Sequence, residues 1–414
     1  MKERCSSKYL LSTALVACAL GCAVYSPAAE AATEKVLYSF GNAPDGQNPE
    51  GGLIDVGGTL YGATENGGTG CSGSGCGTVF SVNPQTGAEA VLYSFCGQAN
   101  CTDGKYPRFG SLINIKGMLY GTTQQGGSNP AGCSGYGCGT VFALNPATDQ
   151  ETVLHSFGNG TDGWWPLAGL LKVKDTLYGT TWRGGPQSNC SGSGCGTVFS
   201  LDRKTDAEAV VYSFEGYSAG DGANPRDSLI NVDGTLYGTT FFGGPAKNGE
   251  GYGTVFSVNP KTRAETVLYS FDGGDTDGGS PVAGLIQDKG MLYGVTQSDG
   301  AYYNGTVFSI NPQTGAETVL YSFGNGTDAQ TPIGGLVRVG HELYGTSYSG
   351  GIYNDGAVFS YDTTTGAEKV LWSFGSGTDG ENPYAGLINV GGTLYGTTAS
   401  GGSYGNGTVF SIVP

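Results

Sequence analysis

Short runs of alternating apolar and polar residues recur along the chain at intervals of 51 to 62 residues. Each recurrence contains VLYSF or a close variant, then a stretch such as GGLIDV with GTLYGAT, then a segment such as GTVFSV. The phenylalanine that closes the first motif falls at seven positions, which are Phe40, Phe95, Phe157, Phe214, Phe271, Phe323 and Phe374. This repetition predicts an array of identical supersecondary units, and helical periodicity is absent.

Each unit contains four runs that are typical of short β-strands. In the first unit they are Gly52–Val56, Thr59–Thr64, Thr78–Val82 and Ala90–Phe95, rich in β-branched and aromatic residues. A Gly-Gly turn joins the first two runs, and Asn-Pro-Gln-Thr-Gly joins the last two, so both connections predict hairpins. Four-stranded meanders of this length are typical of propeller blades.

The two ends of the array are complementary. It begins with a lone fourth strand, Lys35–Phe40, and it stops at Pro414 after a third strand. If the first strand completes the last unit, no sheet edge stays open. The sequence therefore predicts an all-β fold in one domain, residues 32–414: a seven-bladed β-propeller of four-stranded antiparallel blades with 3+1 closure by the N-terminal strand. The long loops are expected on one face of the ring, where function is to be sought.

Residues 1–31 have the pattern of an export signal. Three basic residues precede an apolar run, and the small-residue stretch SPAAEAA follows it. Cleavage is expected after Ala29-Glu30-Ala31, while Leu15-Val16-Ala17-Cys18 also fits a lipoprotein signal that would leave a lipidated Cys18. The protein is expected to be secreted, periplasmic or at the cell surface, with no transmembrane segment after signal removal.

The cysteines and the charge agree with export. After the leader, eight cysteines form four C-x4-C pairs, which predict four local disulfides: Cys71–Cys76, Cys96–Cys101, Cys133–Cys138 and Cys190–Cys195. Zinc binding by these pairs is disfavoured because no histidine lies near them. The formal net charge of −16 disfavours nucleic acid as a partner.

A residue present in all seven units is expected to serve the blade. The tyrosine of LYGT and the phenylalanine of GTVFS are therefore assigned to packing between blades. An aspartate before a proline recurs in every loop that leads into a blade, at Asp45, Asp103, Asp162, Asp221, Asp277, Asp328 and Asp379. Turn formation explains these residues best. A ring of carboxylates that binds Ca²⁺ is the alternative, but no D-x-D-x-D-G loop is present, so no metal site and no cofactor are expected.

The sequence offers little for catalysis. His155 fills the tyrosine position of VLYSF, His341 lies at a tight turn, and no G-x-S-x-G or H-E-x-x-H motif occurs. The protein is therefore expected not to be an enzyme, although a polysaccharide-active hydrolase or lyase on a propeller fold stays open.

Aromatic residues that break the repeat point to a ligand site. Trp164, Trp165, Trp182, Arg183, Phe241 and Phe242 lie in long loops where other units mostly have small or polar residues. Flat rings on a surface with few charges suit the apolar faces of sugars. The resulting hypothesis is a glycan-binding module that is a monomer. The alternatives are ordinary loop anchoring and a scaffold that binds an envelope protein.

The motifs G-L-[IV]-x-V-x-G-x-L-Y-G-T-T, G-T-V-F-S-[VIL] and V-L-Y-S-F-G-x-G-T-D-G resemble the tandem repeat of the choice-of-anchor GloVer-containing proteins. The likeness covers residues 34–414. The resemblance implies an exported bacterial repeat protein with no biochemical activity to carry over. The family often carries a variable C-terminal anchor. This chain stops at Pro414 without one, so secretion, periplasmic residence or lipid attachment at Cys18 is expected in its place.

Overall fold

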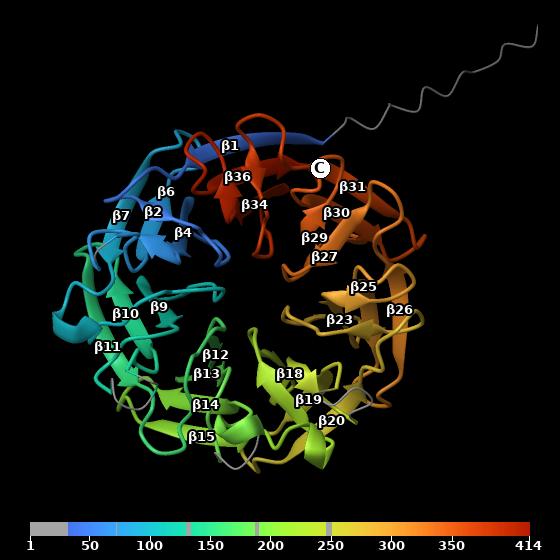
Figure 1. Ribbon diagram of the computed structural model, residues 1–414, viewed down its shortest axis with the longest axis horizontal. Coiled ribbons are helices and arrows are strands. Elements are labelled where there is room, and N and C mark those ends of the chain that lie inside the picture. Colours follow the sequence, from blue (N-terminus) through green and yellow to red (C-terminus); the bar gives the residue numbers. More distant parts are fainter. Residues whose placement is uncertain (1–31, 72, 130–132, 134, 187–189, 246–250) are drawn as a thin grey trace, which may run out of the picture. The chain divides into compact units, whose positions relative to one another are not determined.

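A computed structural model describes residues 32–414 except for residues 72, 130–132, 134, 187–189 and 246–250. In it, seven antiparallel sheets surround a central axis and form the predicted seven-bladed β-propeller (Figure 1). Residues 32–414 make one compact unit. The predicted export signal, residues 1–31, lies outside the described residues. Among the described residues, no helix has the length and apolar character needed to cross a membrane.

In the first three blades the four strands follow chain order from the axis to the rim. Their bounds are β3 (Ile54–Val56), β4 (Thr59–Thr64), β6 (Thr78–Val82) and β7 (Glu89–Ser94) in blade 1; β8 (Ile113–Ile115), β9 (Met118–Thr123), β10 (Thr140–Asn145) and β11 (Gln150–Ser156) in blade 2; and β12 (Leu171–Val173), β13 (Thr176–Thr181), β14 (Thr197–Asp202) and β15 (Glu208–Ser213) in blade 3.

Blades 4 to 6 repeat this order. Their strands are β17 (Ile230–Val232), β18 (Thr235–Gly243), β19 (Thr254–Val258) and β20 (Glu265–Ser270); β22 (Ile286–Asp288), β23 (Met291–Thr296), β25 (Thr306–Ile310) and β26 (Glu317–Ser322); and β28 (Val337–Val339), β29 (Glu342–Gly350), β30 (Ala357–Asp362) and β31 (Glu368–Ser373). The sequence placed the start of the innermost strand of blade 1 two residues early, at Gly52.

Blade 7 closes the ring. It contains β33 (Ile388–Val390), β34 (Thr393–Thr398), β36 (Thr408–Val413) and, from the other end of the array, β1 (Thr33–Ser39). β1 pairs antiparallel with β36, with Thr33 opposite Val413 and Ser39 opposite Thr408. The predicted 3+1 closure is confirmed, and blade 7 gains its outer strand from the start of the array.

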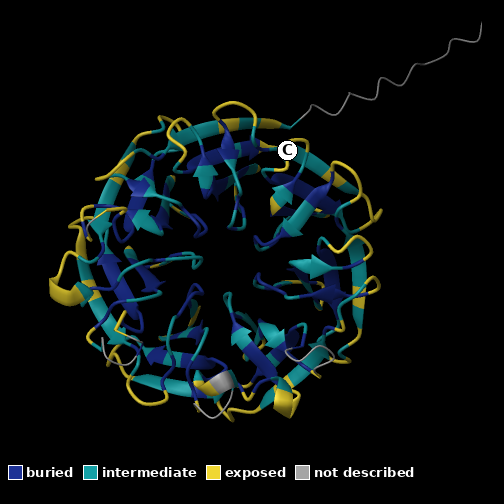
Figure 2. Cartoon of the chain, viewed as in Figure 1, coloured by how far each residue is buried: buried dark blue, intermediate teal, exposed yellow. Residues whose placement is uncertain are grey.

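Phenylalanine pairs join each blade to the next. The closing phenylalanine of one unit meets the GTVF phenylalanine of the following blade edge to face, as Phe40 meets Phe80 with ring centroids 5.0 Å apart. The same contact recurs in all seven interfaces, in the further pairs Phe95–Phe142, Phe157–Phe199, Phe214–Phe256, Phe271–Phe308, Phe323–Phe359 and Phe374–Phe410. Gly62 makes room for this packing, because a Cβ there would lie 2.6 Å from the Phe80 ring. The hydrophobic core therefore lies between neighbouring blades, and Figure 2 shows the residues there as buried.

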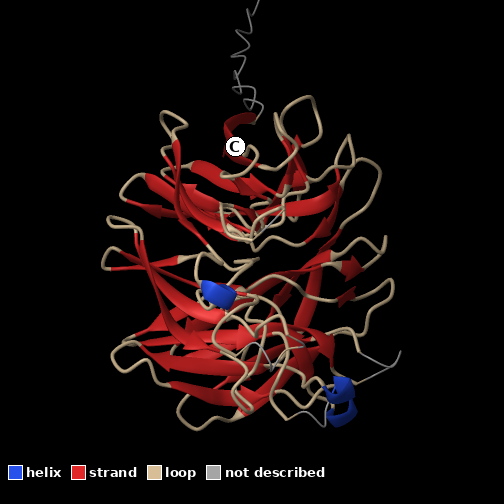
Figure 3. Ribbon diagram, turned by 60° about the vertical axis from the view of Figure 1, so that its left-hand side comes forward, coloured by secondary structure: helices blue, strands red, loops and turns tan. Residues whose placement is uncertain are grey.

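Short strand pairs tie the long loops together on one face. They are β2 (Gly46–Gln47) with β5 (Asn66–Gly67), β16 (Gly222–Pro225) with β18, β21 (Gly278–Gly279) with β24 (Ser298–Asp299), β27 (Ala329–Pro332) with β29, and β32 (Gly380–Glu381) with β35 (Ser400–Gly401). Helix in the described residues is limited to three 3₁₀ turns in these loops, η1 (Ala99–Cys101), η2 (Cys190–Gly192) and η3 (Tyr217–Ala219) (Figure 3). The loops that lead into the blades and the loops between the second and third strands thus share one surface, here called the long-loop face.

Candidate functional site

The repeated aspartates shape the loops that lead into the blades. Asp45 accepts hydrogen bonds from the backbone N–H groups of Gly41 and Gly46 and from the Tyr38 hydroxyl, at 2.6, 2.7 and 2.8 Å. In every interface the aspartate binds the aromatic residue of the VLYSF position, including His155 and Trp372 where these replace tyrosine. The predicted turn role is confirmed, and the structure adds a bond to the outer strand that the sequence did not predict.

A glutamate at or near the start of each outer strand faces the aspartate of the loop that leads into its blade. Burial and the nearby aspartate raise the pKa of Glu34, Glu89, Glu151, Glu208 and Glu317 to about 7, with His155 lowering that of Glu208, and raise the pKa of Glu265 and Glu368 to about 8. At least one carboxylate oxygen of each glutamate is buried without a hydrogen-bond partner. The rim therefore carries a sevenfold set of partly buried acid pairs, which belongs to the scaffold because it repeats.

The six residues predicted as a ligand site form two contact groups on the long-loop face. In the first group, the Trp164 and Trp165 rings lie 5.6 Å apart, and the Arg183 guanidinium lies 5.0 Å from the Trp165 ring. In the second group, the Trp182 ring lies 5.7 Å from the Phe241 ring, and the Phe241 ring lies 4.5 Å from the Phe242 ring. Backbone hydrogen bonds between the loops hold the two groups beside each other.

A groove between blades 3 and 4 brings only part of this set together. Its volume is about 230 Å³, and it is lined by Trp182, Arg183, Cys190, Ser193, Gly194, Tyr217, Ala223, Asn224 and Phe242. Trp164 instead packs against the core of blades 2 and 3. The groove lined by Trp182 and Phe242 is called the blade 3–4 groove below. It combines aromatic surface with polar side chains, as ligand pockets do.

Trp165 adopts a backbone conformation that is unfavourable for its residue type. Its φ is 60°, and its indole Nε1 is buried with no hydrogen-bond partner. The equivalent position has positive φ in all seven loops, and three of them use asparagine, which tolerates this conformation: Asn48, Asn224 and Asn382. Each asparagine also donates a side-chain hydrogen bond to a carbonyl of the preceding blade. Trp165 lacks this bond, and its backbone is strained because a tryptophan occupies a position whose positive φ suits asparagine better.

A second cavity lies at the axis of the ring. Its volume is about 210 Å³, and residues from blades 1, 2, 4, 5, 6 and 7 line it. The position after the repeated proline reaches this cavity from five loops, through Glu50, Arg226, Val282, Ile333 and Tyr384. We call this cavity the axial pocket.

Stacked side chains form one wall of the axial pocket. The Arg226 guanidinium lies 4.5 Å from the Phe109 ring and 5.7 Å from the Tyr384 ring, and it donates a 2.9 Å hydrogen bond to the Tyr384 hydroxyl. The Phe109 and Tyr384 rings stack at 5.0 Å. This arrangement fixes Arg226 by cation–π contacts and one hydrogen bond.

Two carboxylates share one guanidinium beside this wall. Arg108 binds Glu50 at 2.6 Å and Glu65 at 3.2 Å, and its guanidinium lies 4.4 Å from the Phe109 ring. Burial and the neighbouring Glu50 raise the pKa of Glu65 above its ordinary range. Asp227 also lines the pocket; it accepts backbone N–H bonds from Ser228 and Gly284, while burial raises the pKa of its carboxyl group.

Sequence reasoning missed the residues of the axial pocket. The signal was present in the repeat: five units read Pro-x-[Ala/Gly]-Gly-Leu, whereas the second has one extra residue between the proline and the leucine, which brings in Phe109, and the fourth has Asp227 in place of the small residue. Arg108 and Arg226 stand where three other units have leucine, valine or isoleucine. These departures lie next to a proline, and the predicted turn role of that segment concealed them.

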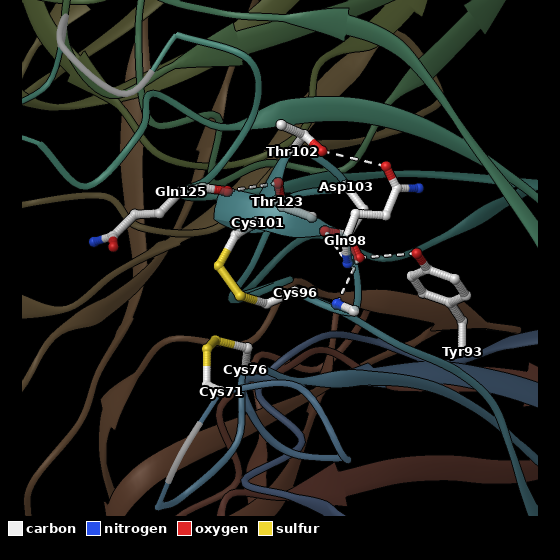
Figure 4. The surroundings of a disulfide bond; sticks show 11 residues. Cys71, Cys76, Tyr93, Cys96, Gln98, Cys101, Thr102, Asp103, Thr123 and Gln125 are labelled. Carbon is white, nitrogen blue, oxygen red and sulfur yellow. Dashed lines mark hydrogen bonds between the residues drawn. A yellow bond between two sulfur atoms is a disulfide. The ribbon is translucent and has the colours of Figure 1, made fainter.

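All four predicted disulfides are present. The Cα–Cα distances are 5.6, 4.0, 5.4 and 5.3 Å for Cys71–Cys76, Cys96–Cys101, Cys133–Cys138 and Cys190–Cys195. The first two lie next to each other, between the long loop of blade 1 and the loop that leads into blade 2 (Figure 4). They hold loops on the long-loop face, and they agree with an oxidising compartment.

Comparison with known proteins identifies the repeat. The family model described as the Gloeobacter/Verrucomicrobia repeat matches residues 21–192 and 187–410. A search of curated proteins found no match.

Comparison with solved structures supports the fold. An oligogalacturonate lyase from Vibrio parahaemolyticus is 12% identical, with a TM-score of 0.55 and coverage of 92% of this chain and 93% of that one. An oligogalacturonate lyase in complex with manganese is 13% identical, with a TM-score of 0.54 and coverage of 93% and 94%. The extracellular domain of a one-component system from B. thetaiotaomicron is 13% identical, with a TM-score of 0.50 and coverage of 89% and 40%. At these identities the likeness concerns the propeller fold alone.

Proposed function

Because this chain belongs to the Gloeobacter/Verrucomicrobia repeat family and folds as a seven-bladed propeller, we propose that it is an exported carbohydrate-binding module. The disulfides support a location outside the cytoplasm. The repeat supplies the scaffold, so the ligand is expected to bind where the repeat is broken. Two such places share the long-loop face: the blade 3–4 groove and the axial pocket.

The blade 3–4 groove is the observation that carries this proposal. Trp182 and Phe242 offer flat apolar surface, while Arg183, Ser193 and Asn224 offer polar groups at its edge. A sugar ring has an apolar face for the aromatic side chains and hydroxyl groups for the polar ones. We therefore place the main sugar subsite in this groove.

The loop that leads into blade 4 connects the groove with the axial pocket. Ala223 and Asn224 line the groove, and Arg226 and Asp227 line the axial pocket. An oligosaccharide lying along this loop would contact both cavities. The proposed ligand is therefore a chain of sugars, with Tyr384 and Arg226 as a second contact point.

The charge of the protein favours a neutral glycan over a polyuronate. The chain carries a formal net charge of −16, which repels a polyanion. Arg108 is already paired with Glu50 and Glu65, and Arg226 lies beside Asp227 in the sequence. The lyases that share this fold act on oligogalacturonate, so the proposal separates this protein from them by ligand charge.

A glycan array probed with the exported, disulfide-bonded protein tests this proposal. Trp182→Ala is expected to weaken binding to any hit by at least about tenfold, or about 1.4 kcal/mol. Tyr404→Ala is the matched control, because Tyr404 is an exposed aromatic residue in the loop between β35 and β36 of blade 7, three blades away from the groove in either direction. Binding that survives Trp182→Ala would place the ligand elsewhere.

Binding of a protein partner is the competing function. If no glycan binds and a pull-down recovers an envelope protein whose capture depends on Trp182, the long-loop face serves as a scaffold. If only acidic oligosaccharides bind, the charge argument is wrong, and the axial pocket becomes the place to look for lyase chemistry.

A further inference from the structure

We propose that His155, Asp162 and Glu208 form a binding site for a divalent transition-metal ion of the Zn²⁺ type, at the rim between blades 2 and 3. The three residues come from β11, from the loop that leads into blade 3, and from the first residue of β15. This site lies apart from the residues of the blade 3–4 groove and does not depend on the proposed function.

The geometry fits a metal ion. One ligand atom from each residue lies within 4.8 Å of the other two, and the His155 Nε2 to Asp162 Oδ2 distance is 3.1 Å. Zinc binds nitrogen and oxygen ligands at about 2.0–2.2 Å, so tetrahedral ligands stand about 3.3–3.5 Å apart. Bringing the Glu208 carboxylate to this spacing needs a shift of its flexible side chain by at most about 1.5 Å. One position would stay open for water.

The ligands are held in place by their surroundings. Asp162 Oδ1 accepts hydrogen bonds from the N–H groups of Gly158 and Asn159, at 3.0 and 2.9 Å, which leaves Oδ2 directed toward His155. The His155 ring packs edge to face on Phe157 at 4.7 Å. Only Glu208 must move, and its Oε1 is buried without a hydrogen-bond partner.

Histidine distinguishes this interface from the other six. Five of the others have tyrosine at this position and one has Trp372. A protonated hydroxyl or an indole N–H donates a hydrogen bond to the aspartate but offers a divalent ion a poor ligand, whereas imidazole has a nitrogen lone pair. The repeated Asp and Glu supply two carboxylates everywhere, and only here does a nitrogen ligand complete the set.

Charge and access also favour a cation at this position. Two facing carboxylates inside a chain of net charge −16 gain from a divalent ion between them. The His155 side chain is 18% exposed and Glu208 is also partly exposed, so an ion can reach the site from solvent.

Zn²⁺ titration of the full exported protein, dialysed against EDTA and kept free of reductant, tests the site. Calorimetry should show one equivalent bound. His155→Tyr installs the residue found in most other blades, so it should fold normally, keep its melting temperature within a few degrees, and weaken Zn²⁺ binding by at least about tenfold. His341→Gln controls for the other histidine, and it should keep the full equivalent.

A gain-of-site variant makes the test independent of loss. Tyr321→His places histidine beside Asp328 and Glu368 in the interface of blades 5 and 6, and it should raise the stoichiometry to two. Absence of Zn²⁺ binding in the wild-type protein, or unchanged binding in His155→Tyr, would overturn the proposal. A Tyr321→His protein that gains no site would contradict the geometric argument.

Discussion

Raising the pH from 5 to 8 should destabilise the propeller, because half-buried glutamates in the blade interfaces must lose a proton. The prediction uses six glutamates and leaves out Glu208, which is a proposed metal ligand. The six have pKa values of about 7 to 8 and are Glu34, Glu89, Glu151, Glu265, Glu317 and Glu368. Their folded pKa values lie above the unfolded value of about 4.5. The stability they contribute is therefore fully present below the unfolded pKa and is lost as the pH rises through 7 to 8.

The magnitude follows from the size of these shifts. One pKa unit corresponds to about 1.4 kcal/mol, but the side chains are partly exposed and solvent screens them, so we take about 1 kcal/mol for each glutamate. Six glutamates together give about 6 kcal/mol. With an unfolding entropy of about 2.1 cal/mol/K per residue over residues 32–414, this corresponds to a fall in melting temperature of about 7 °C.

Differential scanning calorimetry between pH 5 and pH 8.5 measures this effect. A Glu265→Gln/Glu317→Gln/Glu368→Gln variant should be stabilised at pH 8 and should lose about half of the pH dependence. Asp275→Asn removes an exposed carboxylate from the loop that leads into blade 5, so it controls for net charge. A melting temperature that is flat or rises between pH 5 and pH 8, or a triple variant with the full slope, would refute the reasoning.

Three further outcomes are expected. Thr331→Asn should raise the free energy of unfolding by about 1 kcal/mol, because asparagine tolerates φ 54° better than threonine and can repeat the two hydrogen bonds of Asn382; an unchanged or lower value in urea denaturation would count against this. Deletion of β1 should open the edge of β36 and promote aggregation, seen by light scattering; a deletion variant that stays monomeric with an unchanged melting temperature would disprove the closure. Cys96→Ser/Cys101→Ser should cost roughly 2 kcal/mol and leave the ring folded, as circular dichroism can verify; loss of the fold would contradict the local role of this disulfide.

The architecture could be predicted because the same pattern of four strands recurs seven times along the chain. Phenylalanines such as Phe40 and Phe80 recur at fixed positions, and complementary ends imply a closed ring. The loop strands β2 and β5 could not be predicted, because Gly46–Gln47 and Asn66–Gly67 have no apolar alternation and are paired only by the surrounding fold.

The same comparison of repeats selected the candidate site residues, and it located them only in part. Comparison of repeats singled out Trp182 as a departure from the pattern, but it did not show that Trp164 faces the core while Trp182 lines a groove. Glu208 could not be singled out by comparing the repeats, because every unit has a glutamate at this position. Glu208 lies close to His155, which is 53 residues earlier in the chain, only because blades 2 and 3 pack against each other in the ring.

A crystal structure of the protein with a glycan identified on the array is the most direct test of the central claim, that ligand binds where the repeat is broken on the long-loop face. The account predicts a sugar ring against Trp182 and Phe242 in the blade 3–4 groove, with further sugars along the loop toward Arg226. A glycan bound on the opposite face, or against the repeated residues of the rim, would contradict it.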